Sequence, residues 1–219
     1  MKRIICAIIL ASLLLTVFTA CNANKNEKHL APALNEIDFS KTSSIEGLTT
    51  TDTPTDYVLI EVADHGSILL RLYPNVAPDS VENFKRLVEK KFYDGTIFHR
   101  VIEDFMIQGG DSEEADKEPT IKGEFTSNGF TNNLLHLRGV LSMARTSVPD
   151  SASTQFFICH KTSAHLDEDY AAFGYVVYGM DTVDSIAKVS TDSSDKPKTD
   201  VVMTSVRFAD VSGVTFDIK

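Results

Sequence analysis

The sequence predicts a mainly β protein built on an antiparallel sheet, either closed as a barrel or stacked as a sandwich. Short stretches of alternating apolar and polar residues recur along most of the chain after Tyr57. Only two segments have the spacing of an amphipathic helix, and few strand–helix–strand units occur, which disfavours a parallel sheet. Closure into a barrel would remove the exposed edges that so many short strands create.

The first strands are expected to form a hairpin, because residues 57–62 and 67–72 alternate on either side of Gly66. A helix then begins at Pro78, where the missing N–H costs nothing in the first turn. One face of this helix is apolar: Val81, Phe84, Leu87 and Val88.

Further short strands follow the first helix, with a second amphipathic helix around Val183 and a last strand at the end of the pattern. The expected strands cover residues 97–102, 106–109, 139–144, 155–160, 172–177 and 201–208.

The start of the chain belongs to another class of segment. Lys2 and Arg3 precede an apolar run, Ile4–Phe18, that is shorter than the roughly 20 residues of a permanent membrane helix. The run ends at Cys21 and resembles a bacterial lipoprotein signal, in which the cysteine thiol is acylated. An ordinary secretory signal with an incidental cysteine is the alternative.

Three regions are therefore expected along the chain. Residues 1–20 form the signal peptide, and residues 21–55 carry the lipidated Cys21 and a flexible tether rich in Asn, Lys, Glu, Thr and Ser. Residues 56–219 form the folded domain. These expectations place the domain outside the cytoplasm, anchored by lipid to a bacterial membrane.

Charge and cysteine content limit which partners and which disulfide bonds are expected. The net charge is −10, whereas nucleic-acid binding requires a basic surface, so a nucleic-acid partner is excluded. Of the three cysteines, Cys6 lies in the apolar run and Cys21 would carry lipid. Cys159 is then left alone in an apolar strand, so no disulfide is expected in the domain.

Several blocks of the domain carry an unusual mixture of aromatic, charged and glycine residues. The stretch FHRVIEDFMIQGGD, residues 98–111, is followed in order by GVLSMA (139–144), STQFFI (153–158) and FGYV (173–176). Together these blocks resemble the cyclophilin-type peptidyl-prolyl isomerases. The resemblance implies a closed eight-stranded antiparallel β-barrel capped by two α-helices, with the substrate groove on its outside, and an enzyme that accelerates rotation about X–Pro bonds.

The resemblance also implies the roles of individual residues. Arg100 is the expected catalytic cation, and Gln108 is expected to hydrogen-bond either Arg100 or the substrate backbone. No cofactor and no metal are needed, because no bond is cleaved. The expected substrate-binding residues are Phe105, Met106, Ala144, Arg145, Gln155, Phe157, His165, Leu166 and Tyr170.

Three groove positions depart from the best-known members of the family. His165 stands where those members have a tryptophan, Tyr170 where they have a histidine, and Arg145 where they have an asparagine. Loss of the indole N–H removes a donor used to bind cyclosporin, so weak sensitivity to this drug is expected.

The expected substrates are proline-containing polypeptides, in particular exported proteins, and the protein is expected to be a monomer. A proline-peptide binding module with little turnover is the first alternative. A hydrolase using Cys159 with His160, His136 or His165 is the second. Neighbouring residues on a strand point to opposite faces, so Cys159 and His160 cannot pair directly.

Overall fold

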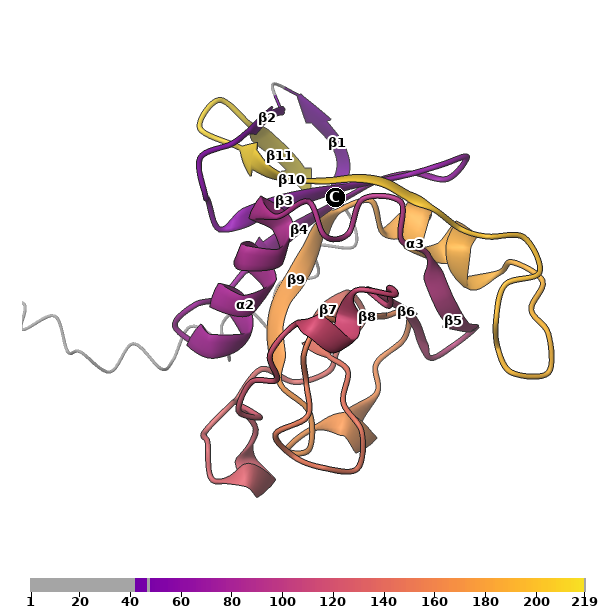
Figure 1. Ribbon diagram of the computed structural model, residues 1–219. Helices are drawn as coiled ribbons and strands as arrows, with labels where there is room; N and C mark the ends of the chain where they lie inside the picture. The colour runs from indigo at the N-terminus through magenta and orange to yellow at the C-terminus, as the bar shows by residue number, and fades with distance from the viewer. Residues whose placement is uncertain (1–41, 47, 219) are drawn as a thin grey trace, which may run out of the picture.

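The structure is a computed structural model that describes residues 42–46 and 48–218. It is mainly β, with two α-helices among these residues, α2 (Pro78–Glu89) and α3 (Met180–Ala187) (Figure 1). The strands are β1 (Thr42–Glu46), β2 (Thr49–Thr51), β3 (Tyr57–Val62), β4 (Gly66–Leu72), β5 (Phe98–Ile102), β6 (Met106–Gly109), β7 (Val140–Met143), β8 (Phe156–Cys159), β9 (Ala172–Tyr178), β10 (Met203–Asp210) and β11 (Thr215–Ile218).

The strands form one large and one small antiparallel sheet. Nine strands pair in the order β2-β10-β3-β4-β9-β7-β8-β6-β5, and β1 pairs with β11 in a separate sheet. The expected closed eight-stranded barrel is therefore not confirmed, because the sheet has nine strands and β5 has no strand ladder with β10. The segments beside these two strands are linked by local contacts instead. Ile97 and Val202 form an isolated bridge, and the N–H of Phe98 donates to the Val201 carbonyl at 3.0 Å. Met203 exchanges backbone hydrogen bonds with Gly95 and Thr96, both at 2.8 Å.

The predicted elements from the first hairpin to the last long strand are confirmed. β3 and β4 pair from Tyr57 with Arg71 to Val62 with Gly66, as the alternation around Gly66 predicts. The helix α2 begins at Pro78. β1, β2 and β11 were not predicted.

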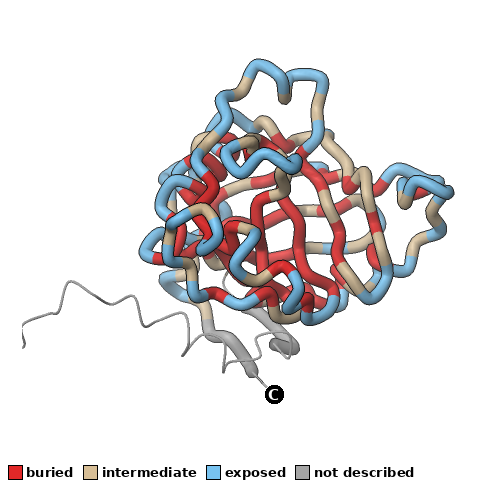
Figure 2. Tube along the Cα trace, turned by 90° about the horizontal axis from the view of Figure 1, so that it is seen from below, coloured by how far each residue is buried: buried red, intermediate tan, exposed pale blue. Residues whose placement is uncertain are grey.

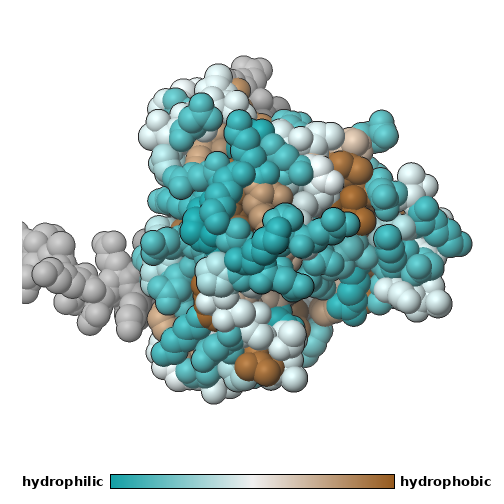
Figure 3. All heavy atoms as spheres, viewed as in Figure 1, coloured by the Kyte–Doolittle hydropathy of each residue, from teal (hydrophilic) through white to brown (hydrophobic). Residues whose placement is uncertain are grey.

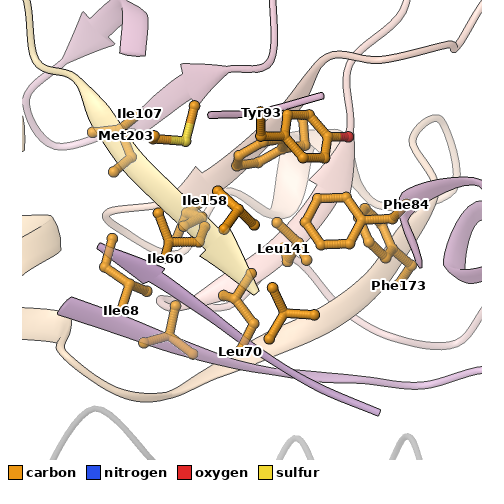
Figure 4. Packing of buried hydrophobic residues seen from close by; sticks show 14 of the residues in the cluster. Ile60, Ile68, Leu70, Phe84, Tyr93, Ile107, Leu141, Ile158, Phe173 and Met203 are labelled. Carbon is orange, nitrogen blue, oxygen red and sulfur yellow. The ribbon is translucent and has the colours of Figure 1, made fainter. Parts of the chain in front are cut away.

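The main core joins inward-facing residues of the large sheet with residues of both α2 and α3. Figure 2 shows the buried segments gathered at the centre of the domain, with exposed loops around them. Phe84 of α2 lies 5.2 Å from the Tyr93 ring and 5.4 Å from the rings of both Phe156 and Phe173. Such tilted and edge-on aromatic pairs add to the free energy gained by burying apolar area. Figure 4 shows this cluster, with side chains from β3, β4 and β10 packed against it.

A distant carboxylate caps the first turn of α2. Ala77 precedes the helix and offers no side-chain cap. The buried Glu124 instead accepts hydrogen bonds from the backbone N–H groups of Asp79 and Ser80, at 3.0 and 2.8 Å, and from the Ser80 hydroxyl at 2.7 Å. Because these N–H groups have no partner within the helix, Glu124 fixes where α2 begins.

The region expected to be a tether contains two strands in its described part. β1 pairs with β11, and β2 pairs with the end of β10 from Thr49–Asp210 to Thr51–Phe208. The predicted signal peptide, Cys21 and the rest of the tether up to residue 41 lie outside the described residues. No helix within the described part is both long and apolar enough to cross a membrane.

The face seen in Figure 3 is mostly hydrophilic, with small separate apolar patches. Among the described residues, the large apolar side chains classed as exposed are Leu135 and Val148.

Candidate active site

The hairpin of β5 and β6 sorts the side chains of residues 98–111 onto two faces. Phe98, Val101 and Ile107 belong to the main core, whereas Met106 belongs to a second apolar cluster on the other face of the sheet. β8 alternates in the same way, with Phe157 in the second cluster. The motif therefore builds both core and surface, and its outer face carries the candidate site.

A hollow of about 100 Å³ opens beside the second cluster. All the predicted catalytic and substrate-binding residues except Gln155 and His165 line it. Its lining comprises Arg100, Phe105, Met106, Gln108, Ala144, Arg145, Phe157, Leu166 and Tyr170.

The floor and one wall of the hollow are apolar. Met106, Phe157 and Leu166 are 2%, 5% and 7% exposed, so their side chains are held by packing and present only an edge to the hollow. Tyr170 meets Phe157 edge to face, with ring centroids 5.9 Å apart. This surface can accept a small saturated ring that brings no polar group of its own.

Arg100 lies at the rim as a half-exposed cation. Its Nε is 3.5 Å from an Asp195 carboxylate oxygen, and its side chain is 43% exposed. Gln108 is directly opposite Arg100 in the β5–β6 ladder.

Of the two partners expected for Gln108, Arg100 or the substrate backbone, the structure does not show a hydrogen bond to Arg100. The Gln108 side-chain N–H donates to the Gln155 amide oxygen at 2.8 Å, and the Gln155 N–H donates to Asp111 at 3.2 Å. These two hydrogen bonds leave the Gln108 side-chain oxygen available as an acceptor.

Arg145 also lines the hollow, and its guanidinium has several partners. The guanidinium lies 4.9 Å from the Phe125 ring centroid and 4.6 Å from that of Tyr170. Its Nε and Nη2 donate to the Asp169 carbonyl at 3.0 and 2.8 Å, and its Nη1 donates to that of Thr146 at 2.8 Å. The guanidinium itself is thus part of the wall.

The other two predicted residues lie next to the hollow. Gln155 lines an adjoining, more polar hollow of about 400 Å³, which shares Gln108, Ala144 and Arg145 with the first. The His165 ring packs on Phe105 with centroids 5.3 Å apart.

The protein-family model described as cyclophilin type peptidyl-prolyl cis-trans isomerase matches residues 57–208 of the chain. The chain belongs to this family. The matched region contains every residue that lines the hollow. It also contains both helices, the strands from β3 to β9, and β10 as far as residue 208.

Bacterial cyclophilins are among its similar relatives. The chain is 44% identical over 156 residues to a peptidyl-prolyl cis-trans isomerase of Acinetobacter baylyi, covering 67% of this chain and 82% of that protein. It is 42% identical over 155 residues to the isomerase B of Escherichia coli, covering 65% and 94%.

The solved structures agree on the fold. A cyclophilin of Cryptosporidium parvum, crystallised in the presence of the dipeptide Ala-Pro, matches with a TM-score of 0.63 at 28% identity, over 69% of this chain and 98% of that one.

Cys159 of this cyclophilin is not placed for nucleophilic chemistry. Cys159 is fully buried, and burial raises the pKa of its thiol to about 12, so the thiolate is absent at neutral pH. His160 is engaged elsewhere: its Nδ1 accepts from the Asp104 backbone N–H at 2.9 Å, and its Nε2 is 3.2 Å from Asp184. Within the part of the chain described, no group of three or more His, Cys, Asp or Glu side chains could hold a metal ion.

Sequence reasoning missed two features around the site. One is a buried chain behind Phe157, in which His136 hydrogen-bonds Asp167 through Nδ1 and Ser142 through Nε2, both at 3.0 Å. Ser142 is fully buried, so this arrangement supports the floor rather than reaching a substrate. The other is Asp195, which lies far from the motif in sequence and inside a polar loop. No sequence pattern distinguishes it from the other loop aspartates.

Proposed function

We propose that the protein is a peptidyl-prolyl cis-trans isomerase in which Arg100 is the catalytic cation. The observation that carries this proposal is a half-exposed guanidinium at the rim of an apolar hollow. In this assignment the proline ring enters the hollow, and Gln108 accepts a hydrogen bond from the peptide or from Arg100.

The reaction needs charge placed beside a rotating amide. The X–Pro bond resists rotation by about 18–20 kcal/mol, because rotation breaks the resonance of its C–N bond. In the twisted state the proline nitrogen becomes pyramidal and regains a lone pair. A fixed guanidinium stabilises that state more than either planar isomer, which lowers the barrier without a covalent step.

The magnitudes divide the work between two parts of the site. An acceleration of six decades requires about 8 kcal/mol. One oriented donor supplies about 3–4 kcal/mol of this. The remainder comes from holding the substrate in a conformation that favours rotation, which is the role of the apolar floor.

The test is isomerisation of an X–Pro peptide by the purified protein and by Arg100→Ala. We expect kcat/KM to fall about 100-fold or more in the variant. Lys188→Ala, which removes a positive charge beyond the end of α3, is the control and should keep full activity. Binding of a proline peptide without acceleration of its isomerisation, in the unaltered protein, would favour the binding-module alternative.

The pH profile gives a second readout of the same assignment. Guanidinium does not titrate near neutrality, so the rate should stay nearly constant from about pH 7 to 9. Burial lowers the pKa of the adjacent His99, so this imidazole is neutral over that range. A bell-shaped profile there would require a titrating acid or base and would contradict the mechanism.

We further propose that the protein is a monomeric lipoprotein that works on exported proteins outside the cytoplasm. The support is the sequence of residues 1–21, with a charged start, an apolar run and Cys21. Cys21→Ser should abolish incorporation of labelled fatty acid and release the protein from the membrane fraction. If the unaltered protein takes up no labelled fatty acid and is already absent from the membrane fraction, residues 1–21 act as an ordinary secretory signal.

A further inference from the structure

The loop between α3 and β10 carries the partner of Arg100. Asp195 is the residue whose carboxylate faces the Arg100 Nε, and both side chains are 43% exposed. No other ion pair or side-chain hydrogen bond of Arg100 is formed with the described residues. Among these residues the guanidinium therefore has one ion-pair partner, at its Nε edge.

The backbone of this loop is fastened to the strand that carries Arg100. The Asp195 carbonyl accepts the N–H of Val101, the residue that follows Arg100, at 2.8 Å. β5 is the last strand of the sheet, so this bond satisfies an N–H on its free edge. The position of Asp195 relative to Arg100 is thus set by the fold rather than by the side-chain pair alone.

The loop itself is an ordered turn. The Asp192 carboxylate accepts the backbone N–H groups of Ser194 and Lys196, at 2.8 and 3.1 Å. Across the base of the loop, the N–H of Lys198 donates to the Ser190 carbonyl at 2.9 Å. Asp195 has a left-handed backbone, with φ of 63°, a conformation that aspartate, asparagine and glycine adopt more readily than other residues.

We propose that Asp195 is a positioning residue for the isomerase reaction. Its carboxylate holds the Nε edge of Arg100, so that the terminal amino groups are presented to the hollow. This inference rests on the proposed function. It adds a residue on a separate loop that determines how the catalytic charge is aimed.

The planarity of guanidinium makes this arrangement effective. The group is planar, so a carboxylate beside its Nε edge favours one orientation of the plane that contains the other four N–H donors. Those donors then remain for the substrate. An ion pair this exposed contributes little to folding stability. A catalytic effect of Asp195 can therefore be separated from an effect on the fold.

The test uses two substitutions that suit the left-handed backbone. Asp195→Gly removes the side chain and keeps the backbone conformation, whereas Asp195→Asn removes the charge and keeps an acceptor oxygen. We expect kcat on an X–Pro peptide to fall about tenfold for Asp195→Gly, within the loss that a misplaced reacting group produces, and less for Asp195→Asn. KM should stay the same in both, because the apolar floor is untouched.

Asp200→Asn is the matched control for net charge. Asp200 is exposed and lies between the Asp195 loop and β10. It makes no hydrogen bond or ion pair with the described residues. This variant should keep the kcat of the unaltered protein. A loss equal to that of Asp195→Asn would show a general charge effect and would overturn the proposal.

A double-mutant cycle distinguishes positioning from loop damage. If Asp195 acts through Arg100, Asp195→Gly should have no further effect in an Arg100→Ala background. Equal losses in both backgrounds, or full kcat in Asp195→Gly, would overturn the inference. In either case an active, Arg100-dependent protein would leave the proposed function standing, whereas an inactive unaltered protein would refute that function itself.

Discussion

Arg100 and Arg145 line the same hollow but are held very differently. Arg145 donates to two backbone carbonyls and lies against the rings of Phe125 and Tyr170. Arg100 has one ion-pair partner and is half exposed. The first guanidinium is therefore part of the wall, and the second retains donors for a ligand. Residue type alone does not distinguish these two roles, because the distinction comes from what surrounds each group.

Replacing Arg145 with lysine should weaken the fold. A lysine ammonium cannot donate along two edges while stacking on a ring, so Arg145→Lys should lower the free energy of unfolding by about 1 kcal/mol. Urea denaturation measures this change. Arg100→Lys is the matched control, because the Arg100 guanidinium has neither a ring nor a carbonyl partner among the described residues. The unfolding free energy of this variant should be unchanged. Equal losses in the two variants would contradict the wall role of Arg145.

His136 makes stability depend on pH in a defined window. Burial lowers the pKa of His136 by more than the Asp167 carboxylate raises it, so the folded state holds a neutral imidazole. The unfolded state takes up a proton near pH 6.5. The stabilisation is therefore complete above about pH 6.5 and is lost as the pH falls toward and through the lower folded pKa.

The measurement is the unfolding free energy between about pH 7 and 5. Carboxylates with lowered pKa values, such as Asp94 and Glu118, lose their contribution at lower pH than this. His136→Asn should flatten the slope. Burial also lowers the pKa of His99. The variant His99→Asn therefore measures how much this second imidazole contributes to the pH dependence of unfolding. An unchanged slope in His136→Asn would show that this imidazole is not the group that titrates.

At the scale of elements, the sequence predicts best where burial imposes a period. β3, β4 and α2 each have one face in the main core, so their apolar spacing is visible in the chain. β2 is short, contains only threonine and has no buried residue, so its pattern carries no such period. The segment predicted as a tether therefore contains two strands that its sequence does not indicate. β1 forms by pairing with β11, and β2 forms by pairing with β10.

The site divides in the same way. Six of the nine residues that line the hollow lie inside the quoted motif blocks, and Arg145, Leu166 and Tyr170 lie between those blocks, so sequence resemblance identifies them. Asp195 and Glu124 act across long sequence separations, through a loop and a helix start that only the folded chain brings together. No local pattern could indicate either contact.

Glu124 gives the prediction that belongs to α2. A glutamine there keeps one acceptor oxygen but places an N–H₂ group against helix N–H donors, so Glu124→Gln should lower the unfolding free energy by about 1–3 kcal/mol. Thermal and urea unfolding would measure the loss. Glu113→Gln, at an exposed carboxylate on the surface, is the control and should be neutral. A neutral result for Glu124→Gln would mean that the cap does not determine where α2 starts.

At the scale of the whole molecule, the strands that carry the hollow differ from the strands added at the chain ends. β5, β6, β7 and β8 carry the hollow, whereas β2 pairs with residues 208–210 at the end of β10. The β1–β11 sheet lies entirely outside the family-matched residues 57–208. Strand pairing thus extends the family fold through β1, β2 and β11, which contribute no residue to the hollow.

This separation predicts that the added strands can be removed without loss of isomerase activity. A chain of residues 52–210 lacks β1, β2 and β11 but keeps every residue of the hollow and the Asp195 loop. It also keeps the Thr55 hydroxyl contacts to the Tyr57 and Ala209 carbonyls, both at 2.9 Å, which hold the start of β3 against β10. Its kcat/KM should therefore stay within about twofold of the full chain, a change of less than about 0.5 kcal/mol.

The cost of the truncation should appear in stability instead. Leu48 packs against the small cluster around Leu59 and Leu69, and its loss exposes apolar surface along β3, so the melting temperature should fall while unfolding stays cooperative. Isomerase assays and thermal melts on the two chains check both parts. A large loss of kcat/KM in a truncated chain that still melts cooperatively would contradict this prediction. Because that loss could not be attributed to unfolding, it would show that β1, β2 or β11 supports the hollow.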